Sequence, residues 1–286
     1  MDELGHVALS TLSLFGREIS YDPTTFKMTY LVMAIILIVS IMGGRNLRKV
    51  PSKLQNILEL IYEFLAEITV STLGEKDGKR YIPFVVTLFI FVLAANWIGI
   101  FPNILRFVGT MIALVHQLFS GSVQFVYSGL TSMSISVPET VWYSSLLNSH
   151  GIHEPTKSVN TDLAIAILVF ILCQLYGIKN KGIYHYIRDF ADDPFPMKGP
   201  LIIFFFLNPF FYLNLIGMLA NVVSHSFRLF GNIFGGGMII IIVSSLLKYF
   251  LVPVGLFAFF GLFAGLVQAF VFTMLAVTYL QQQQKG

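Results

Sequence analysis

Long apolar runs without aspartate or glutamate alternate with short charged segments along this chain. Three such runs occupy 28–44, 81–105 and 163–178, and a much longer stretch extends from 199 to 284. An α-helix needs about 17–25 apolar residues to cross the hydrocarbon core of a bilayer. The pattern therefore predicts an all-α polytopic membrane protein with about five membrane segments in a single membrane domain.

The segment 51–73 has a different periodicity. Its apolar residues recur at helical spacing, and three glutamates form a stripe on another face, namely Leu54, Ile57, Leu58, Ile61, Leu65 and Ile68 against Glu59, Glu63 and Glu67. This pattern predicts an amphipathic helix that lies in the membrane interface or docks a partner. A surface helix with one solvated face is the simpler alternative.

Basic residues indicate the topology. Arg45, Arg48 and Lys49 follow the first run, and Lys179 and Lys181 follow the run at 163–178. Short loops rich in lysine and arginine stay in the cytoplasm. We therefore expect the N-terminal segment 1–25 on the outer face, the segment 106–161 as an outer-face insertion, and the C-terminus in the cytoplasm.

The region 199–280 is predicted to form a helical hairpin. Residues 209–247 lack internal proline, and one helix of that length would extend about 58 Å at 1.5 Å per residue. The hydrocarbon core is only about 30 Å thick. Either this helix is steeply inclined, or it breaks at Gly235, Gly236 and Gly237, and residues 254–280 form its partner helix.

Composition excludes several classes. The chain has 286 residues, of which 56% are hydrophobic and 12% charged, and a net charge of only +3. Nothing predicts nucleic-acid binding, a metal site or a cofactor. Cys173 is the single cysteine, and the N-terminus lacks the pattern of a cleavable signal peptide.

Arg228 is the most informative charge. It shares the stretch 199–284 with only one other basic residue, Lys248, and with no acidic residue. An arginine at mid-bilayer costs about 2.5–3.5 kcal/mol on insertion scales, so it needs water or a counter-ion. Because the other long runs hold no carboxylate, we expect another chain to supply the acidic partner.

Polar residues lie before and after Arg228 at helical spacing. Ser224, His225 and Asn232 lie on roughly its face, and Gln268 is the polar residue of the next predicted helix. This arrangement suggests a wet path that ends at a charge. The alternatives are hydrogen bonds between helices for Asn232 and Gln268, and a packed, neutral His225. Arg228 itself could instead cap backbone carbonyls.

Two strings then resemble a known family. Residues 224–237 read Ser-His-Ser-Phe-Arg-Leu-Phe-Gly-Asn-Ile-Phe-Gly-Gly-Gly, and residues 268–280 begin Gln-Ala-Phe-Val-Phe-Thr. Both are similar to signatures of ATP synthase subunit a, as is Asn96 with the following Gly99–Pro102 pattern. The resemblance covers about 25–105 and 160–281, and nothing in 106–161 is carried over.

The resemblance implies the stationary part of a rotary F-type motor, not an enzyme on its own. Arg228 would face the carboxylates of a ring of c subunits, and H+ or Na+ would pass through two half-channels. The implied ion-path residues are Asn232, Gln268, Ser224, His225, Asn214 and Asn96, and the implied ring-packing residues are Gly231, Gly235, Gly236 and Gly237. Further implied partners are the peripheral-stalk b subunits, the rest of the complex and the lipid of a bacterial plasma (inner) membrane.

The sequence departs from the family where ionisable residues are usual. Gly237, Gly261 and Gly99 occupy positions that carry acidic residues or histidine in many proton-driven members, and Asn214 replaces an acidic residue of some members. The half-channels would then be lined by amides, hydroxyls and backbone, which leaves both ions open.

Three other classes remain as hypotheses. A self-contained channel or transporter would need internal carboxylates or inverted repeats, and neither is evident. An intramembrane enzyme would need a nucleophile and base, but His225 has no nearby His, Asp or Glu. A non-catalytic scaffold would tolerate replacement of Arg228.

Overall fold

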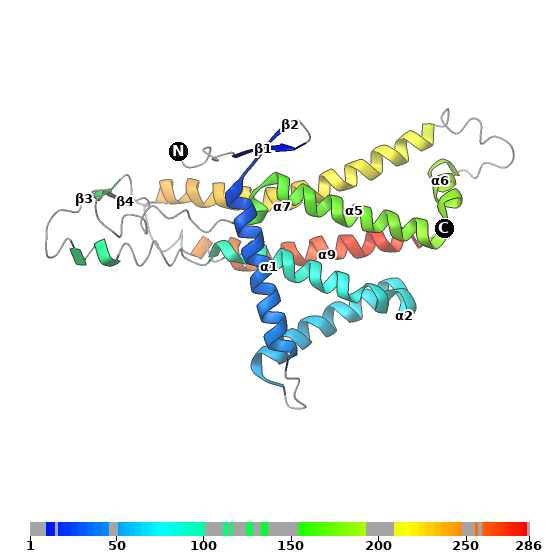
Figure 1. Ribbon diagram of the computed structural model, residues 1–286, viewed down its shortest axis with the longest axis horizontal. Helices are drawn as coiled ribbons and strands as arrows, with labels where there is room; N and C mark the ends of the chain where they lie inside the picture. Colours follow the sequence, from blue (N-terminus) through cyan, green and yellow to red (C-terminus); the bar gives the residue numbers. More distant parts are fainter. Residues whose placement is uncertain are drawn as a thin grey trace.

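The computed structural model describes most of the helical part of the chain (Figure 1). The described residues are 10–14, 17–45, 51–100, 111–113, 115–116, 124–127, 133–136, 154–192, 209–247, 255–256 and 259–284. The long helices are α1 (Pro23–Gly44), α2 (Lys53–Trp97), α5 (Val159–Lys181), α7 (Pro209–Leu247) and α9 (Gly265–Gln282). The shorter helices are η2 (Ile98–Ile100), η3 (Pro155–Lys157), α6 (Ile183–Asp192) and the π-helix η5 (Phe259–Ala264).

The all-α membrane fold predicted from the sequence is confirmed. Among the described residues, four helical segments are long and apolar enough to cross a membrane, namely Pro23–Gly44, Lys53–Ile100, Val159–Lys181 and Phe259–Gln282. The helix α7 is the fifth long apolar helix, with 39 residues. Long exposed apolar surfaces on these helices, such as Ile38 and Met42 of α1, are suited to lipid or to a partner.

Two short antiparallel hairpins accompany the helices, and the sequence analysis did not anticipate them. One joins β1 (Ser10–Leu14) to β2 (Arg17–Tyr21), and the other joins β3 (Gln124–Tyr127) to β4 (Met133–Ser136). An isolated two-stranded hairpin is marginally stable in water. Neither one contributes to the helical core.

The helix α1 begins at a local cap. The side chain of Asp22 accepts a hydrogen bond of 2.9 Å from the backbone N–H of Thr24, and Pro23 occupies the first helical position. Only Val32 of this helix is buried. Figure 1 shows α1 crossing the direction of the other long helices.

The helix α2 consists of two arms that meet at Gly74. This residue has φ of 79° and ψ of 167°, a conformation that favours glycine and interrupts the helix. The first arm therefore ends where the sequence predicted the end of the amphipathic segment 51–73. Its buried face contains Leu65, Thr69 and Leu73, whereas the glutamate stripe is exposed.

Two glutamines at the end of α9 satisfy the carbonyls that this kink leaves open. Gln281 Nε2 donates to the carbonyl of Thr72 and Gln284 Nε2 to that of Leu73, each at 3.0 Å. At its other end, α2 donates side-chain hydrogen bonds to η5 and α9. The antiparallel pair of α2 and α9 is thus joined at both ends.

The core lies between these helices. Val85 and Val92 of α2 and Phe272 and Leu280 of α9 have no exposed surface, and Val169 of α5 is 1% exposed. The helix α7 packs mainly along α5, so α5, α7, α9 and the second arm of α2 run side by side (Figure 1).

The helix α7 continues without a break through Gly235, Gly236 and Gly237. Its 39 residues correspond to about 58 Å at 1.5 Å per residue. Of the two alternatives drawn from the sequence, the unbroken helix is therefore the correct one. A continuous helix of this length fits a bilayer about 30 Å thick only when it is strongly inclined.

Candidate functional site around Arg228

Arg228 lies on the exposed side of α7. Its side chain is exposed, and it forms no hydrogen bond or salt bridge with any residue that the structure describes. Ser224 and Gly231, one turn before and nearly one turn after it, are exposed on the same side. The alternative in which Arg228 caps carbonyls of its own chain therefore finds no support among the described residues.

The opposite side of α7 is buried against α5 and α9. His225 is 2% exposed, and its ring centroid lies 3.7 Å from that of Phe272 and 5.7 Å from that of Tyr279. Neither ring nitrogen has a hydrogen-bond partner among the described residues, and the same is true of the Ser226 hydroxyl. Buried polar groups without partners are costly unless water reaches them.

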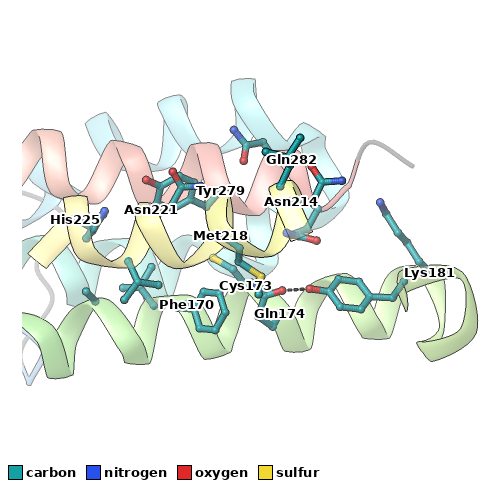
Figure 2. Close-up of a pocket in the computed structure, with 17 residues that line it drawn as sticks. Phe170, Cys173, Gln174, Lys181, Asn214, Met218, Asn221, His225, Tyr279 and Gln282 are labelled. Atoms are coloured by element: carbon teal, nitrogen blue, oxygen red, sulfur yellow. Dashed lines mark hydrogen bonds between the residues drawn. The ribbon is translucent and has the colours of Figure 1, made fainter. Parts of the chain in front are cut away.

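A cavity of about 350 Å³ opens beside His225, and we name it the Asn214 cavity (Figure 2). It lies between α5, α6, α7 and the end of α9, and its polar lining is rich in amides, namely Gln174, Asn214, Asn221, Gln282 and Gln283. The Tyr186 hydroxyl donates to Gln174 Oε1 at its wall. Lys181 is the only charged residue among those that line it.

A second cavity, of about 270 Å³, lies on the other side of Arg228, and we name it the Asn96 cavity. Its lining comes from the end of α2, η2, η3, α7, η5 and the first residue of α9. The polar and charged lining residues are Asn96, Asn232, Glu154 and Lys157. Four glycines, Gly236, Gly237, Gly261 and Gly265, form much of the remaining wall.

Three side chains from α2 and α7 hold the backbone around this cavity. Asn96 Nδ2 donates to the Gly265 carbonyl at 3.1 Å, and Trp97 Nε1 donates to the Leu262 carbonyl at 3.1 Å. Asn232 Nδ2 makes a longer contact of 3.4 Å to the Ala264 carbonyl. A π-helix shifts backbone hydrogen bonds to i→i+5, so carbonyls near its end need such partners.

The glycines have two different surroundings. A Cβ added at Gly236 would lie 3.0 Å from the Phe260 side chain, and one added at Gly261 would lie 2.8 Å from the Ile100 side chain. These two glycines therefore allow close packing within the chain. At Gly231, Gly235 and Gly237 an added Cβ would have no atom of another described residue within 4 Å, apart from the nearby backbone of α7 itself. These three leave open space on α7, which is what the expected role in packing against a partner requires.

Gln268 does not meet Asn232, although the sequence suggested that the two amides face each other. Gln268 is 7% exposed, and its Nε2 has no hydrogen-bond partner among the described residues. Asn232 donates to backbone instead. The alternative of hydrogen bonds between helices therefore applies to Asn232, which donates to the backbone next to α9. It does not apply to Gln268 among the described residues.

The sequence analysis missed two carboxylates. Glu154 was assigned to the outer-face insertion, yet it lines the Asn96 cavity. Asp162 was placed just before a span, but α5 already begins at Val159, and Asp162 has no exposed surface and, among the described residues, no partner for either carboxylate oxygen. Its spacing to the buried residues Ala166, Val169 and Cys173 was the signal that could have revealed it.

No metal site is evident in the described residues, because no group of three His, Cys, Asp or Glu side chains is placed to hold an ion. The long helices, the exposed arginine and the two separate polar cavities define a polytopic membrane protein in which α7 carries a fixed charge between two polar cavities.

Comparison with known proteins identifies the family. The sequence model described as "ATP synthase A chain" matches residues 26–281. ATP synthase subunit a of Desulfosudis oleivorans is 32% identical over 251 residues, which cover 88% of this chain and 83% of that protein. ATP synthase subunit a 3 of Pelobacter propionicus is 31% identical over 265 residues, covering 92% and 88% respectively. The Geobacter sulfurreducens subunit a is 30% identical over 253 residues, covering 88% and 84%.

The chain therefore belongs to the ATP synthase subunit a family. It is a non-catalytic, ion-conducting membrane subunit of an F-type ATP synthase, as the resemblance of its two motifs implied.

Proposed function

We propose that the two cavities are half-channels that deliver an ion to, and remove it from, the carboxylates of a rotating ring, with Arg228 between them. One observation carries this proposal. His225, three residues before Arg228, lines the Asn214 cavity, and Asn232, four residues after it, lines the Asn96 cavity. No residue lines both cavities. The seven residue steps from His225 to Asn232 extend about 10 Å along a helix, so the two paths end close together on either side of the charge.

Arg228 supplies the electrostatic part of the mechanism. A guanidinium stays protonated in proteins, so it does not carry the proton itself. Two opposite unit charges about 4 Å apart attract by about 4 kcal/mol at an effective dielectric of about 20. A ring carboxylate that reaches Arg228 is therefore favoured in its ionised form and releases its ion into one cavity. It reloads from the other cavity after it has moved on.

The exposed face of α7 fits the proposed ring. Large apolar side chains flank the arginine along it, including Val223, Phe227, Phe234 and Met238, and Gly231 and Gly235 lie between them. Small residues let membrane helices approach closely. A ring of apolar helices, each with one carboxylate, supplies both the packing surface and the counter-ion that α7 lacks. The peripheral-stalk b subunits and the rest of the complex are the further proposed partners.

The proposed orientation follows from the basic residues. Lys181 lines the Asn214 cavity, and Lys179 lies in the same last turn of α5. Because basic loops stay in the cytoplasm, we assign this cavity and the C-terminus to the cytoplasmic side of a bacterial plasma membrane. The Asn96 cavity and the N-terminus then belong to the outer side. A membrane potential contributes about 2.3 kcal/mol per charge per 100 mV to such a path.

The test replaces the arginine in the assembled complex. In membrane vesicles, Arg228→Ala is expected to abolish ATP-driven ion pumping while ATP hydrolysis by the detached catalytic part continues. A cysteine at position 232 should cross-link to a small acidic helical subunit. Pumping at the normal rate by Arg228→Ala, or ion flux through the purified chain alone, would refute the proposal and favour a self-contained channel.

A further inference from the structure

Glu154 is the one carboxylate among the described residues that line the Asn96 cavity. The only other charged lining residue is Lys157, the last residue of the short helix η3 that Glu154 precedes, and the structure gives no salt bridge between them. The lining residues from α2, η2, α7, η5 and α9 carry no titratable side chain. Any proton that rests in this cavity therefore has one carboxylate to rest on.

Gly99 makes room for this carboxylate. A Cβ added at Gly99 would collide with Oε1 and Cδ of Glu154, and the Cγ would lie at 2.5 Å. The Glu154 side chain thus occupies the space that a side chain at position 99 would fill. A residue larger than glycine at position 99 would displace Glu154 from the cavity.

Neighbouring residues fix the segment that carries Glu154. Pro155 and Thr156 are buried, and the Thr156 hydroxyl donates to Asn96 Oδ1 at 2.8 Å. Asn96 in turn donates to the Gly265 carbonyl. The residue that follows Glu154 by two positions is therefore tied to both α2 and α9, so Glu154 is held at the cavity and is not part of a freely solvated loop.

The cavity extends from Glu154 to Asn232, four residues from Arg228 on α7. A carboxylate at one end and a fixed positive charge near the other suit a path along which a proton moves by steps. We propose that Glu154 is the proton-relay residue of the Asn96 cavity. A proton from water binds its carboxylate oxygen, and this O–H bond then breaks as the proton passes through cavity water toward the ring, which regenerates the carboxylate.

This inference rests on the proposed half-channels, and the experiment separates the two. Passive proton uptake is measured with a pH-sensitive dye in vesicles that carry the complex without its catalytic part. Glu154→Gln keeps the shape and removes the relay, and we expect a loss of about tenfold or more, since a positioned proton-transfer group contributes about 10²–10⁴-fold. Glu63→Gln, an exposed carboxylate that lines neither cavity, is the matched control and should conduct normally.

A relocated carboxylate gives the decisive readout. Glu154→Ala should be inactive, and the double variant Glu154→Ala with Gly99→Asp should recover most of the conductance, because the new carboxylate enters the space that Glu154 vacates. Recovery supports a relay and not a merely structural role. Normal conductance in Glu154→Gln, or an assembled but inactive double variant, would overturn the inference. If Arg228→Ala still stops ATP-driven pumping in vesicles that carry the whole complex, the proposed half-channels survive that result.

Discussion

The two cavities that approach Arg228 are built in different ways. The Asn214 cavity lies between regular helices and is lined by amide side chains such as Gln174 and Asn221. The Asn96 cavity is lined by four glycines together with apolar side chains such as Ile240, and it is bordered by the π-helix η5. Polar space within a membrane domain can thus be made by projecting amides into it, or by removing side chains and widening a helix.

The difference predicts where each cavity is fragile. Irregular backbone at membrane depth is tolerated only where protein or water satisfies its polar groups. The Asn96 cavity therefore depends on the side chains of Asn96, Trp97 and Asn232, which donate to carbonyls of η5 and α9. The Asn214 cavity lies between regular helices, so Asn221, which has no hydrogen bond among the described residues, is replaceable there at a lower cost in stability.

The largest expected effect tests whether both cavities belong to one path. Gly217 lines the Asn214 cavity and Gly237 lines the Asn96 cavity, and an added Cβ at either glycine meets no atom within 4 Å. We expect Gly217→Leu and Gly237→Leu each to lower passive proton conductance about tenfold or more, because an apolar side chain dewets a narrow polar path. The measurement is dye-monitored proton uptake in vesicles.

The control for this pair is Gly44→Leu on α1, a glycine that is equally open and lines neither cavity. It should conduct normally. Isolation of the complex with its small ring subunit shows whether a variant still assembles. When two half-channels lie in series, each carries the whole proton flux, so either leucine alone should block conduction. If only one of the two variants blocks conduction in assembled complexes, the series arrangement is contradicted.

Local sequence patterns were enough to predict much of this molecule. The charge-free runs located the long helices, and the absence of proline between 209 and 253 left two alternatives for 209–247, of which the structure has the unbroken helix. The periodicity of 51–73 predicted a helix that ends near Gly74. The spacing of i−3 and i+4 neighbours also drew attention to His225 and Asn232, although the structure buries His225 and leaves Arg228 exposed.

Features that arise from tertiary contacts were not predictable in this way. The π-helix η5 reads as an ordinary apolar run, and its stability depends on donors from α2 and α7, more than 30 residues away along the chain. Glu154 gains its position through the bond between Thr156 and Asn96, 60 residues apart. The positions of the basic loops assigned 106–161, and Glu154 with it, to the outer face, and a single carboxylate near a span gave no sign that it lines a cavity.

A second prediction compares one amide from each cavity. Asn96→Leu leaves the Gly265 carbonyl and the Thr156 hydroxyl without their partner, and each unsatisfied buried group costs about 1–3 kcal/mol. Asn221 is exposed, and the structure gives it no hydrogen bond to the residues it describes. We therefore expect Asn221→Leu to change the free energy of unfolding by less than about 0.5 kcal/mol.

Thermal unfolding of the detergent-purified subunit provides the measurement for this pair. The unfolding midpoint should fall clearly for Asn96→Leu and stay near the native value for Asn221→Leu. Equal falls of the unfolding midpoint in both variants would mean that the Asn214 cavity also depends on hydrogen bonds from its amides. The contrast between the two cavities would then fail.

The smallest expected effect concerns the end of α9, where two cavity-lining glutamines lie between two glutamines that bond the α2 kink. Gln281 and Gln284 cap carbonyls at the α2 kink, whereas Gln282 and Gln283 line the Asn214 cavity. Removal of one cap by Gln281→Ala should lower the free energy of unfolding by about 0.5–1.5 kcal/mol, the net contribution of one hydrogen bond, with little change in conductance. Gln282→Ala should do the reverse, with a modest loss of conductance at unchanged stability. Stability and conductance are measured by thermal unfolding and by dye-monitored uptake on the same preparations. If stability and conductance fall together in each variant, the glutamine bonds to the α2 kink and the cavity wall form one unit. The kink would then position the cavity wall as well as hold α2 against α9.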